Sequence, residues 1–170
     1  MRIHYQAGDI LTACDNELNV PTGYMGHAAI AVNSEVLIEA VITYPYIQLA
    51  PISEFEQKHP KHAVYRPLSP ELGKAAADYA VRYWQASNDY KSQGINIPPF
   101  SFSPLIPLND PWSSVYCSKL VWLCYRHGAG YSFYNDFMLF TPEDLDAVLS
   151  RDPNFALIYK HPEFQFYLDT

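Results

Sequence analysis

Strand-like and helix-like segments occupy different parts of this chain. Residues 8–12, 26–32, 35–41 and 63–67 are short apolar runs bounded by turn-forming residues, which is typical of β-strands. The Asn-Ser pair at 33–34 separates the second run from the third and predicts a hairpin. All four expected strands therefore precede the first helix signal.

The helix signals come later in the sequence. The Ser-Pro pair at 69–70 offers an N-cap residue followed by a proline at the first helical position, and the Thr-Pro pair at 141–142 repeats this pattern before two acidic residues. Another helix is expected over residues 113–128, and residues 156–159 indicate a last strand. Because strands and helices are segregated, the sequence predicts an α+β fold rather than a doubly wound α/β fold.

A proline-rich segment separates the first two expected helices. Residues 95–112 hold five prolines among apolar residues, and proline removes a backbone donor and blocks regular helix. We therefore expect a long, semi-rigid loop here. The five are Pro98, Pro99, Pro104, Pro107 and Pro111.

Composition limits the classes of function. A chain of 170 residues suits one domain spanning residues 1–170 and can bury a sufficient core without a disulfide or a metal. The net charge of −7 argues against nucleic acid or an anionic membrane surface as a partner, because both attract clustered Lys and Arg. No run approaches the roughly 20 apolar residues of a membrane span, and the N-terminus lacks the pattern of a secretory signal. We expect a cytoplasmic protein.

The three cysteines do not form an even set for disulfides. Cys14, Cys117 and Cys124 include no C-x-x-C pair, and no Cys/His cluster has zinc-site spacing, so no metal or other cofactor is expected. Cys124 lies among apolar neighbours and is expected in the core. Cys14 lies in a polar stretch and is expected to be an exposed thiol without an assisting group.

Cys117 lies near the start of an expected helix, directly after the proline-rich segment. Unpaired N–H groups and the positive end of the helix dipole stabilise a thiolate there, and the thiolate is the nucleophilic form. A lone cysteine is more often a small buried apolar residue. The location and the polar neighbours make Cys117 the candidate nucleophile.

A nucleophilic cysteine needs an imidazole to accept its proton and return it to the leaving group. His27 opens an apolar strand after Gly26, beside small alanines that leave room for the ring. A histidine in a strand is commonly structural, but His27 is the best candidate base. The others are expected to be solvated beside Lys or Pro, at a helix end, or at the N-terminus (His59, His62 and His161; His127; His4).

The base in turn needs an acceptor that orients it. Glu39 lies in the next expected strand among apolar residues, where an unpaired carboxylate would be costly. Glu39 could instead face water at a strand edge, and Glu35 or a backbone carbonyl could orient His27. Together Cys117, His27 and Glu39 form a nucleophile, a base and an orienting group.

The hairpin register decides whether Glu39 can reach His27. A regular two-residue turn at 33–34 would place His27 and Glu39 on opposite faces of the sheet, because side chains alternate with period two. A turn with an odd number of residues, such as 33–35, or a bulge would place them on one face. We predict the odd register, because an inward Glu39 without a partner is the more costly arrangement.

At this level of detail the chain resembles the YiiX-like permuted branch of the NlpC-type papain-like hydrolases. The resemblance rests on an ordered series of motifs within residues 8 to about 145: Gly-Asp-Ile at 8–10, Gly-His-Ala-Ala-Ile at 26–30, Glu-Ala at 39–40, Tyr-Cys-Ser-Lys-Leu-Val-Trp at 116–122 and Thr-Pro-Glu-Asp-Leu at 141–145. It implies a circularly permuted papain-like fold in which an antiparallel sheet bearing the histidine precedes the helix bearing the cysteine.

The resemblance also implies hydrolysis of an amide bond by a Cys-His-polar triad. Carried over by position, Cys117 would be the nucleophile, His27 the base and Glu39 the orienting group. The substrate would be a small peptide, such as a cell-wall fragment, or else a lipid acyl group cleaved by a thioesterase or acyltransferase. A catalytically silent binding module is the third alternative.

Three aromatic residues are candidates for binding the substrate. Phe100 and Phe102 belong to the proline-rich segment and could line an acyl groove. Tyr116 precedes the nucleophile and could place its hydroxyl near a developing oxyanion. Adjacent residues of a helix diverge by about 100°, so Tyr116 could equally pack into the core.

Overall fold

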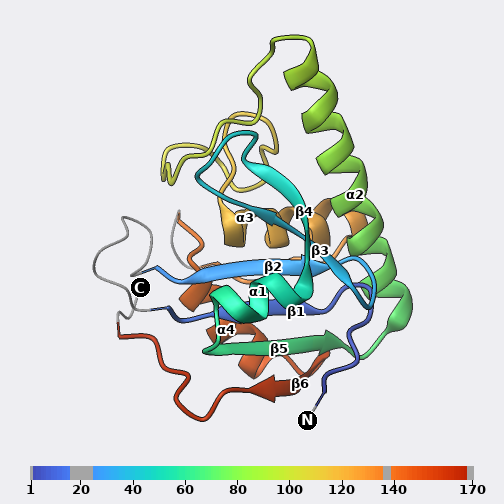
Figure 1. Cartoon of the computed structure of the whole chain (residues 1–170), viewed down its shortest axis with the longest axis vertical. Coiled ribbons are helices and arrows are strands. Elements are labelled where there is room, and N and C mark those ends of the chain that lie inside the picture. The colour runs from blue at the N-terminus through green and yellow to red at the C-terminus, as the bar shows by residue number, and fades with distance from the viewer. Residues whose placement is uncertain (1, 16–24, 136–138, 168–170) are drawn as a thin grey trace.

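A six-stranded antiparallel sheet forms the centre of the computed structural model, which describes residues 2–15, 25–135 and 139–167 (Figure 1). The strand order is β4-β3-β2-β1-β5-β6, so consecutive strands are neighbours except where β5 pairs with β1. The strands are β1 (Ile10–Ala13), β2 (His27–Ala31), β3 (Val36–Ala40), β4 (Ile47–Pro51), β5 (His62–Pro67) and β6 (Phe155–Lys160).

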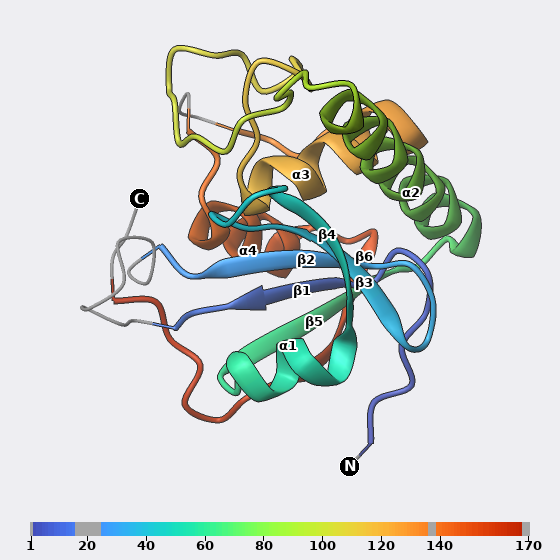
Figure 2. The same cartoon turned by 45° about the horizontal axis from the view of Figure 1, so that its top comes forward.

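Helices cover both faces of the sheet (Figures 1 and 2). The short helix α1 lies on one face, and the other helices lie on the opposite face. Their bounds are α1 (Ile52–Lys58), α2 (Pro70–Ser92), α3 (Cys117–Leu123) and α4 (Pro142–Arg151), and α3 continues into one π-helical turn, η1 (Cys124–Gly128). Within the described part of the chain, no helix is long and apolar enough to cross a bilayer.

The alternation of strand side chains divides the core into two layers. Ile10, Ile30 and Ile38 pack with α3 and the other helices of that face, whereas Leu11 and Leu37 pack under α1 with Phe55. Most positions of the central strands are therefore apolar on both faces. The predicted α+β class is confirmed by this mixed arrangement.

Two helix starts follow the sequence signals. The Ser69 hydroxyl accepts a bond from the backbone N–H of Leu72 and caps α2. Thr141 and Asp144 form a reciprocal capping box at the start of α4, each side chain accepting from the other's backbone N–H.

The helix expected from residue 113 begins later, at Cys117. Val115 is held extended by a bridge to Phe100, with Val115 donating to the Pro99 carbonyl and its own carbonyl accepting from Ser101. This pairing stops the helix from starting before Tyr116. The consequence is that Cys117, rather than Ser113, is the first helical residue.

The proline-rich segment forms no helix or strand apart from that bridge, as expected from its composition. It is tied to the helices at several carbonyl groups. The buried Lys119 ammonium donates to the Pro107 carbonyl at 3.2 Å and to the Ser114 hydroxyl at 3.3 Å, and the Tyr83 hydroxyl donates to the Pro111 carbonyl. These bonds fix the segment above the start of α3.

Candidate active site

Cys117 is the first residue of α3, and its side chain is almost enclosed, with 3% of the residue exposed. The N-cap residue, Tyr116, is extended and gives no side-chain cap. The first N–H groups of a helix have no intrahelical acceptor, so they are oriented toward groups at this end of the helix. This position favours negative charge on the Cys117 sulfur.

His27 is placed by the turn into β2. Gly26 has a φ of +76°, a conformation that side chains strongly disfavour, and a Cβ atom there would lie 2.2 Å from the carbonyl oxygen of Ala13. The strand then begins at His27, which is paired with Ala13 of β1. Because β2 starts here, the imidazole lies at the end of the sheet, where α3 can approach it.

The connection between β2 and β3 has the odd length that was predicted. Val32 donates its N–H to the carbonyl of Val36, and the pairing of Ile30 with Ile38 continues the same register. Residues 33–35 thus form a three-residue turn. His27 and Glu39 consequently lie on one face of the sheet, the face covered by α1.

The turn owes its length to Asn33. Its side-chain oxygen accepts bonds from the backbone N–H groups of Glu35 at 2.8 Å and Val36 at 3.0 Å. Asparagine commonly stabilises turns in this way. Glu35 is exposed within the turn, which removes it as the group that orients His27.

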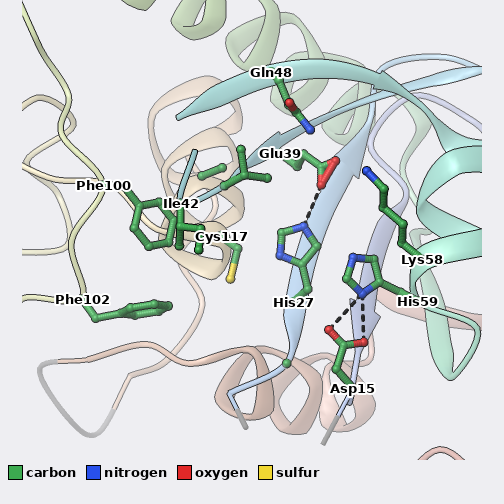
Figure 3. Close-up of a pocket in the computed structure, with 13 residues that line it drawn as sticks. Asp15, His27, Glu39, Ile42, Gln48, Lys58, His59, Phe100, Phe102 and Cys117 are labelled. Carbon is green, nitrogen blue, oxygen red and sulfur yellow. Dashed lines mark hydrogen bonds and ion pairs between the residues drawn. The ribbon is translucent and has the colours of Figure 1, made fainter. Parts of the chain in front are cut away.

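Glu39 is the side chain that binds the His27 ring. The Nε2–H of His27 donates to Oε1 of Glu39 at 2.8 Å, and the other ring nitrogen lies on the side of Cys117 (Figure 3). Burial alone would lower the pKa of His27, but a hydrogen bond and charge from Cys117, together with those from Glu39, raise it from 6.5 to about 10. The favoured state at neutral pH is an imidazolium beside the sulfur.

The carboxylate of Glu39 is 7% exposed as a residue and remains ionised. Burial raises its pKa, but the hydrogen bond and charge of His27 outweigh this, and the pKa lies below its usual value. Gln48, the cross-strand partner of Glu39 on β4, adds a hydrogen bond that lowers the pKa further. Gln48 thus holds the carboxylate toward the imidazole.

These groups line a pocket of about 270 Å³ (Figure 3). Phe100, Phe102 and Ile42 form an apolar wall on the side of the cysteine. On the far side of His27 the lining is polar. The structure therefore brings Cys117, His27 and Glu39 together, with the expected Phe100 and Phe102 beside them. The full lining is Asp15, Gly26, His27, Glu39, Ala40, Val41, Ile42, Gln48, Lys58, His59, Phe100, Phe102 and Cys117.

Tyr116 is a correction to the expected substrate-binding set. It is buried in the core, 1% exposed, and its hydroxyl accepts a bond from the Phe140 N–H at 3.0 Å. Its ring packs against Phe102, with centroids 4.9 Å apart. Tyr116 therefore supports Phe102 from behind and does not line the pocket.

The expectations for three further residues are wrong. Cys14 is fully buried at the end of β1 rather than exposed, and burial raises the pKa of its thiol. His59 is not a solvated side chain but lines the pocket, and His62 is buried with its Nδ1–H donating to the His59 carbonyl at 2.8 Å. Cys124 is buried as expected, and its thiol pKa is likewise raised by burial.

The sequence reasoning missed four polar residues of the pocket: Asp15, Gln48, Lys58 and His59. Gln48 occupies an edge strand that was not expected, and His59 follows a helix, α1, that was not expected either. The sequence does contain one signal for Gln48, because a polar residue within an apolar run on the strand beside Glu39 suggests a cross-strand partner.

Comparison with known proteins gives a match to a solved structure. No protein-family model matches the chain, and no curated protein matches it in sequence. A crystal structure of the metalloprotein YiiX from Escherichia coli O157:H7 matches with a TM-score of 0.60 and 18% sequence identity, covering 94% of this chain and 99% of that chain. The chain therefore shares the fold of YiiX, which in this chain is a mixed α+β arrangement around a six-stranded antiparallel sheet.

Proposed function

We propose that this protein is a cysteine hydrolase with Cys117 as nucleophile, His27 as base and Glu39 as orienting group. The observation that carries the proposal is the 2.8 Å bond from His27 to Glu39, combined with a His27 pKa raised to about 10 by Cys117 and Glu39. An imidazole held in this way stabilises a thiolate at neutral pH and is ready to act as an acid.

The proposed reaction has two stages. The Cys117 thiolate attacks the carbonyl carbon of the substrate, forming a C–S bond and an oxyanion near the backbone N–H of Cys117. The oxyanion collapses, the bond to the leaving group breaks, and the leaving group takes the proton of the His27 imidazolium. Water then attacks the thioacyl group while His27 accepts its proton, and the C–S bond breaks to release the acid.

The order of the elements supports a circularly permuted papain-like arrangement. The strand that carries His27 precedes the helix that carries Cys117, and that helix packs against the antiparallel sheet. The proposal assigns no step to a metal. YiiX is called a metalloprotein, but no three His, Cys, Asp or Glu side chains in residues 2–15, 25–135 and 139–167 are grouped to hold an ion. The side chains of these described residues are not arranged for such a site.

The first candidate substrate is the amide of a small peptide. A pocket of about 270 Å³ is below the usual range for drug-sized ligands, which suits the side chain of one residue at the scissile bond. A second candidate is a thioester or ester with an apolar acyl group. The wall of Phe100, Phe102 and Ile42 beside the sulfur favours it, because an acyl chain next to a scissile carbonyl would contact that wall.

Trapping the thioacyl enzyme tests both candidates. The protein is mixed with p-nitrophenyl esters or p-nitroanilides carrying acetyl, hexanoyl or phenylalanyl groups, and intact mass and peptide mapping locate the added acyl group. The expected result is a burst of one product per protein with the acyl group on Cys117, and no burst from Cys117→Ser. Acylation that is equal in wild type and Cys117→Ser would remove the proposal.

Preference among the acyl groups separates the two substrates. Faster acylation by hexanoyl than by phenylalanyl substrates that share one leaving group would favour the lipid-type substrate. The reverse order would favour a peptide.

A further inference from the structure

A second imidazole–carboxylate pair lies in the same pocket, on the far side of His27 from Cys117 (Figure 3). The chain brings it there through β1. Ala13 pairs with His27 on one side and with His62 on the other. Asp15 lies two residues beyond Ala13, and His59, the C-cap of α1, precedes β5. Both therefore reach the end of the sheet where His27 lies.

The geometry of this pair is specific. The Nδ1–H of His59 donates to both carboxylate oxygens of Asp15, at 2.9 Å each. The two side chains are largely buried, with 19% and 16% exposed. The His59 ring stacks on the His27 ring with centroids 4.8 Å apart and 28° between the planes. The Phe55 ring also stacks on the His27 ring, with centroids 5.7 Å apart and 26° between the planes.

Asp15 is held in an uncommon backbone conformation. Its φ is +28°, on the left-handed side of the Ramachandran plot, which a residue other than glycine adopts at a cost. Residues in such conformations persist where the surrounding structure determines them. Here the conformation accompanies the bond in which the Nδ1–H of His59 donates to both carboxylate oxygens of Asp15.

We propose that His59, anchored by Asp15, is a positioning residue that holds the His27 ring in the plane needed to reach both Cys117 and Glu39. The inference rests on the proposed function. Glu39 fixes one edge of the His27 imidazole, but a single bond leaves the ring free to tilt about it. The aromatic faces of His59 and Phe55 remove this freedom. His59 contacts no reacting atom and acts through His27.

The test is the rate at which iodoacetamide alkylates Cys117, followed against pH by peptide mapping. The titratable groups that influence this pH profile surround the rings of His27 and His59. They are Glu39 on β3, Cys117 on α3, Lys58 on α1 and Asp15 after β1. In the wild type a plateau at neutral pH reports the thiolate–imidazolium pair. Replacement of the exposed His4 by Ala is the control, since it removes an imidazole outside the pocket.

His59→Ala is expected to lower the plateau rate by about tenfold, the value of a lost aromatic pair, and to move its alkaline limit to lower pH. His59→Phe keeps a ring but no donor and should recover most of the rate. His59→Asn keeps a donor for Asp15 but no ring and should resemble His59→Ala. Asp15→Asn keeps the His59 ring but anchors it more weakly, so its plateau rate should lie between those of the wild type and His59→Ala.

Two results overturn the inference. One is a wild-type rate and pH profile in His59→Ala, and the other is an equal rate in His59→Phe and His59→Asn. Should His59→Ala not fold, the comparison of the Phe and Asn variants decides alone. Failure of the proposed function is separate, because the wild type itself would then lack the neutral plateau at Cys117.

Discussion

His27 and Glu39 lie on one face of the sheet, twelve positions apart in sequence, because a three-residue turn joins their strands. Their 2.8 Å bond joins the proposed base to its orienting group. The side-chain oxygen of Asn33 stabilises that turn. The chemistry proposed for Cys117 thus depends on the geometry of a hairpin.

Glu39→Gln tests the charge in this relationship. The amide can keep a contact with His27 but not the negative charge that helps to raise the His27 pKa. A hydrogen bond to a charged group is worth about 1.5–3 kcal/mol, so the alkaline limit of Cys117 alkylation should move down by about 1–2 pH units. Glu35→Gln is the matched control, because Glu35 is exposed in the same hairpin. Identical profiles for the two variants would count against a role for Glu39.

Gly26→Ala tests the turn that positions His27. The new Cβ would lie 2.2 Å from the Ala13 carbonyl oxygen, at a φ of +76°. Gly94→Ala is the matched control, since Gly94 has a φ of +79° but no atom within 4 Å of the added Cβ. The control should cost about 1–2 kcal/mol of unfolding free energy from backbone conformation alone.

Gly26→Ala should cost more than its control and should also slow the alkylation of Cys117. Urea unfolding and alkylation at neutral pH measure the two effects. Equal stability of the two variants would show that the turn tolerates the clash.

The stability of the protein should depend on pH through His27. Its pKa is raised from 6.5 to about 10 in the folded state, so its contribution to stability is complete below pH 6.5 and is lost as the pH rises toward 10. The loss should be at most about 5 kcal/mol, because the pKa rises from 6.5 to about 10 and each pKa unit corresponds to about 1.4 kcal/mol. The measurement is the difference in unfolding free energy between wild type and His27→Phe at several pH values. A difference that stays constant from pH 6 to about pH 10 would contradict the raised pKa.

The sequence allowed much of the fold to be predicted, because the signals were local. The caps at Ser69 and Thr141 and the proline-rich loop each depend on neighbours in sequence. The start of α3 was misplaced, because the bridge that holds Val115 extended comes from Phe100, outside the local pattern. β4 and α1 were missed, because β4 is a short edge strand with an exposed leucine and a terminal proline.

The residues of the candidate site also differ in whether local sequence patterns reveal them. Cys117, His27 and Glu39 could be found because each interrupts or opens an apolar segment with a reactive side chain. The odd hairpin register followed from the cost of burying Glu39 without a partner, and it is confirmed. His59 could not be found, because only the pairing of β1 with both β2 and β5 brings it to His27.

Competition among the three cysteines for a limiting amount of iodoacetamide tests the central claim most directly. The alkylation is carried out near neutral pH on the folded protein, and peptide mapping gives the share of label on each cysteine. Cys117 is expected to take nearly all of the label, because burial raises the thiol pKa of both Cys14 and Cys124. His27→Ala should slow Cys117 by about 10²-fold or more. Faster labelling of Cys14 or Cys124 than of Cys117 in the wild type, or an unchanged rate in His27→Ala, would contradict the account.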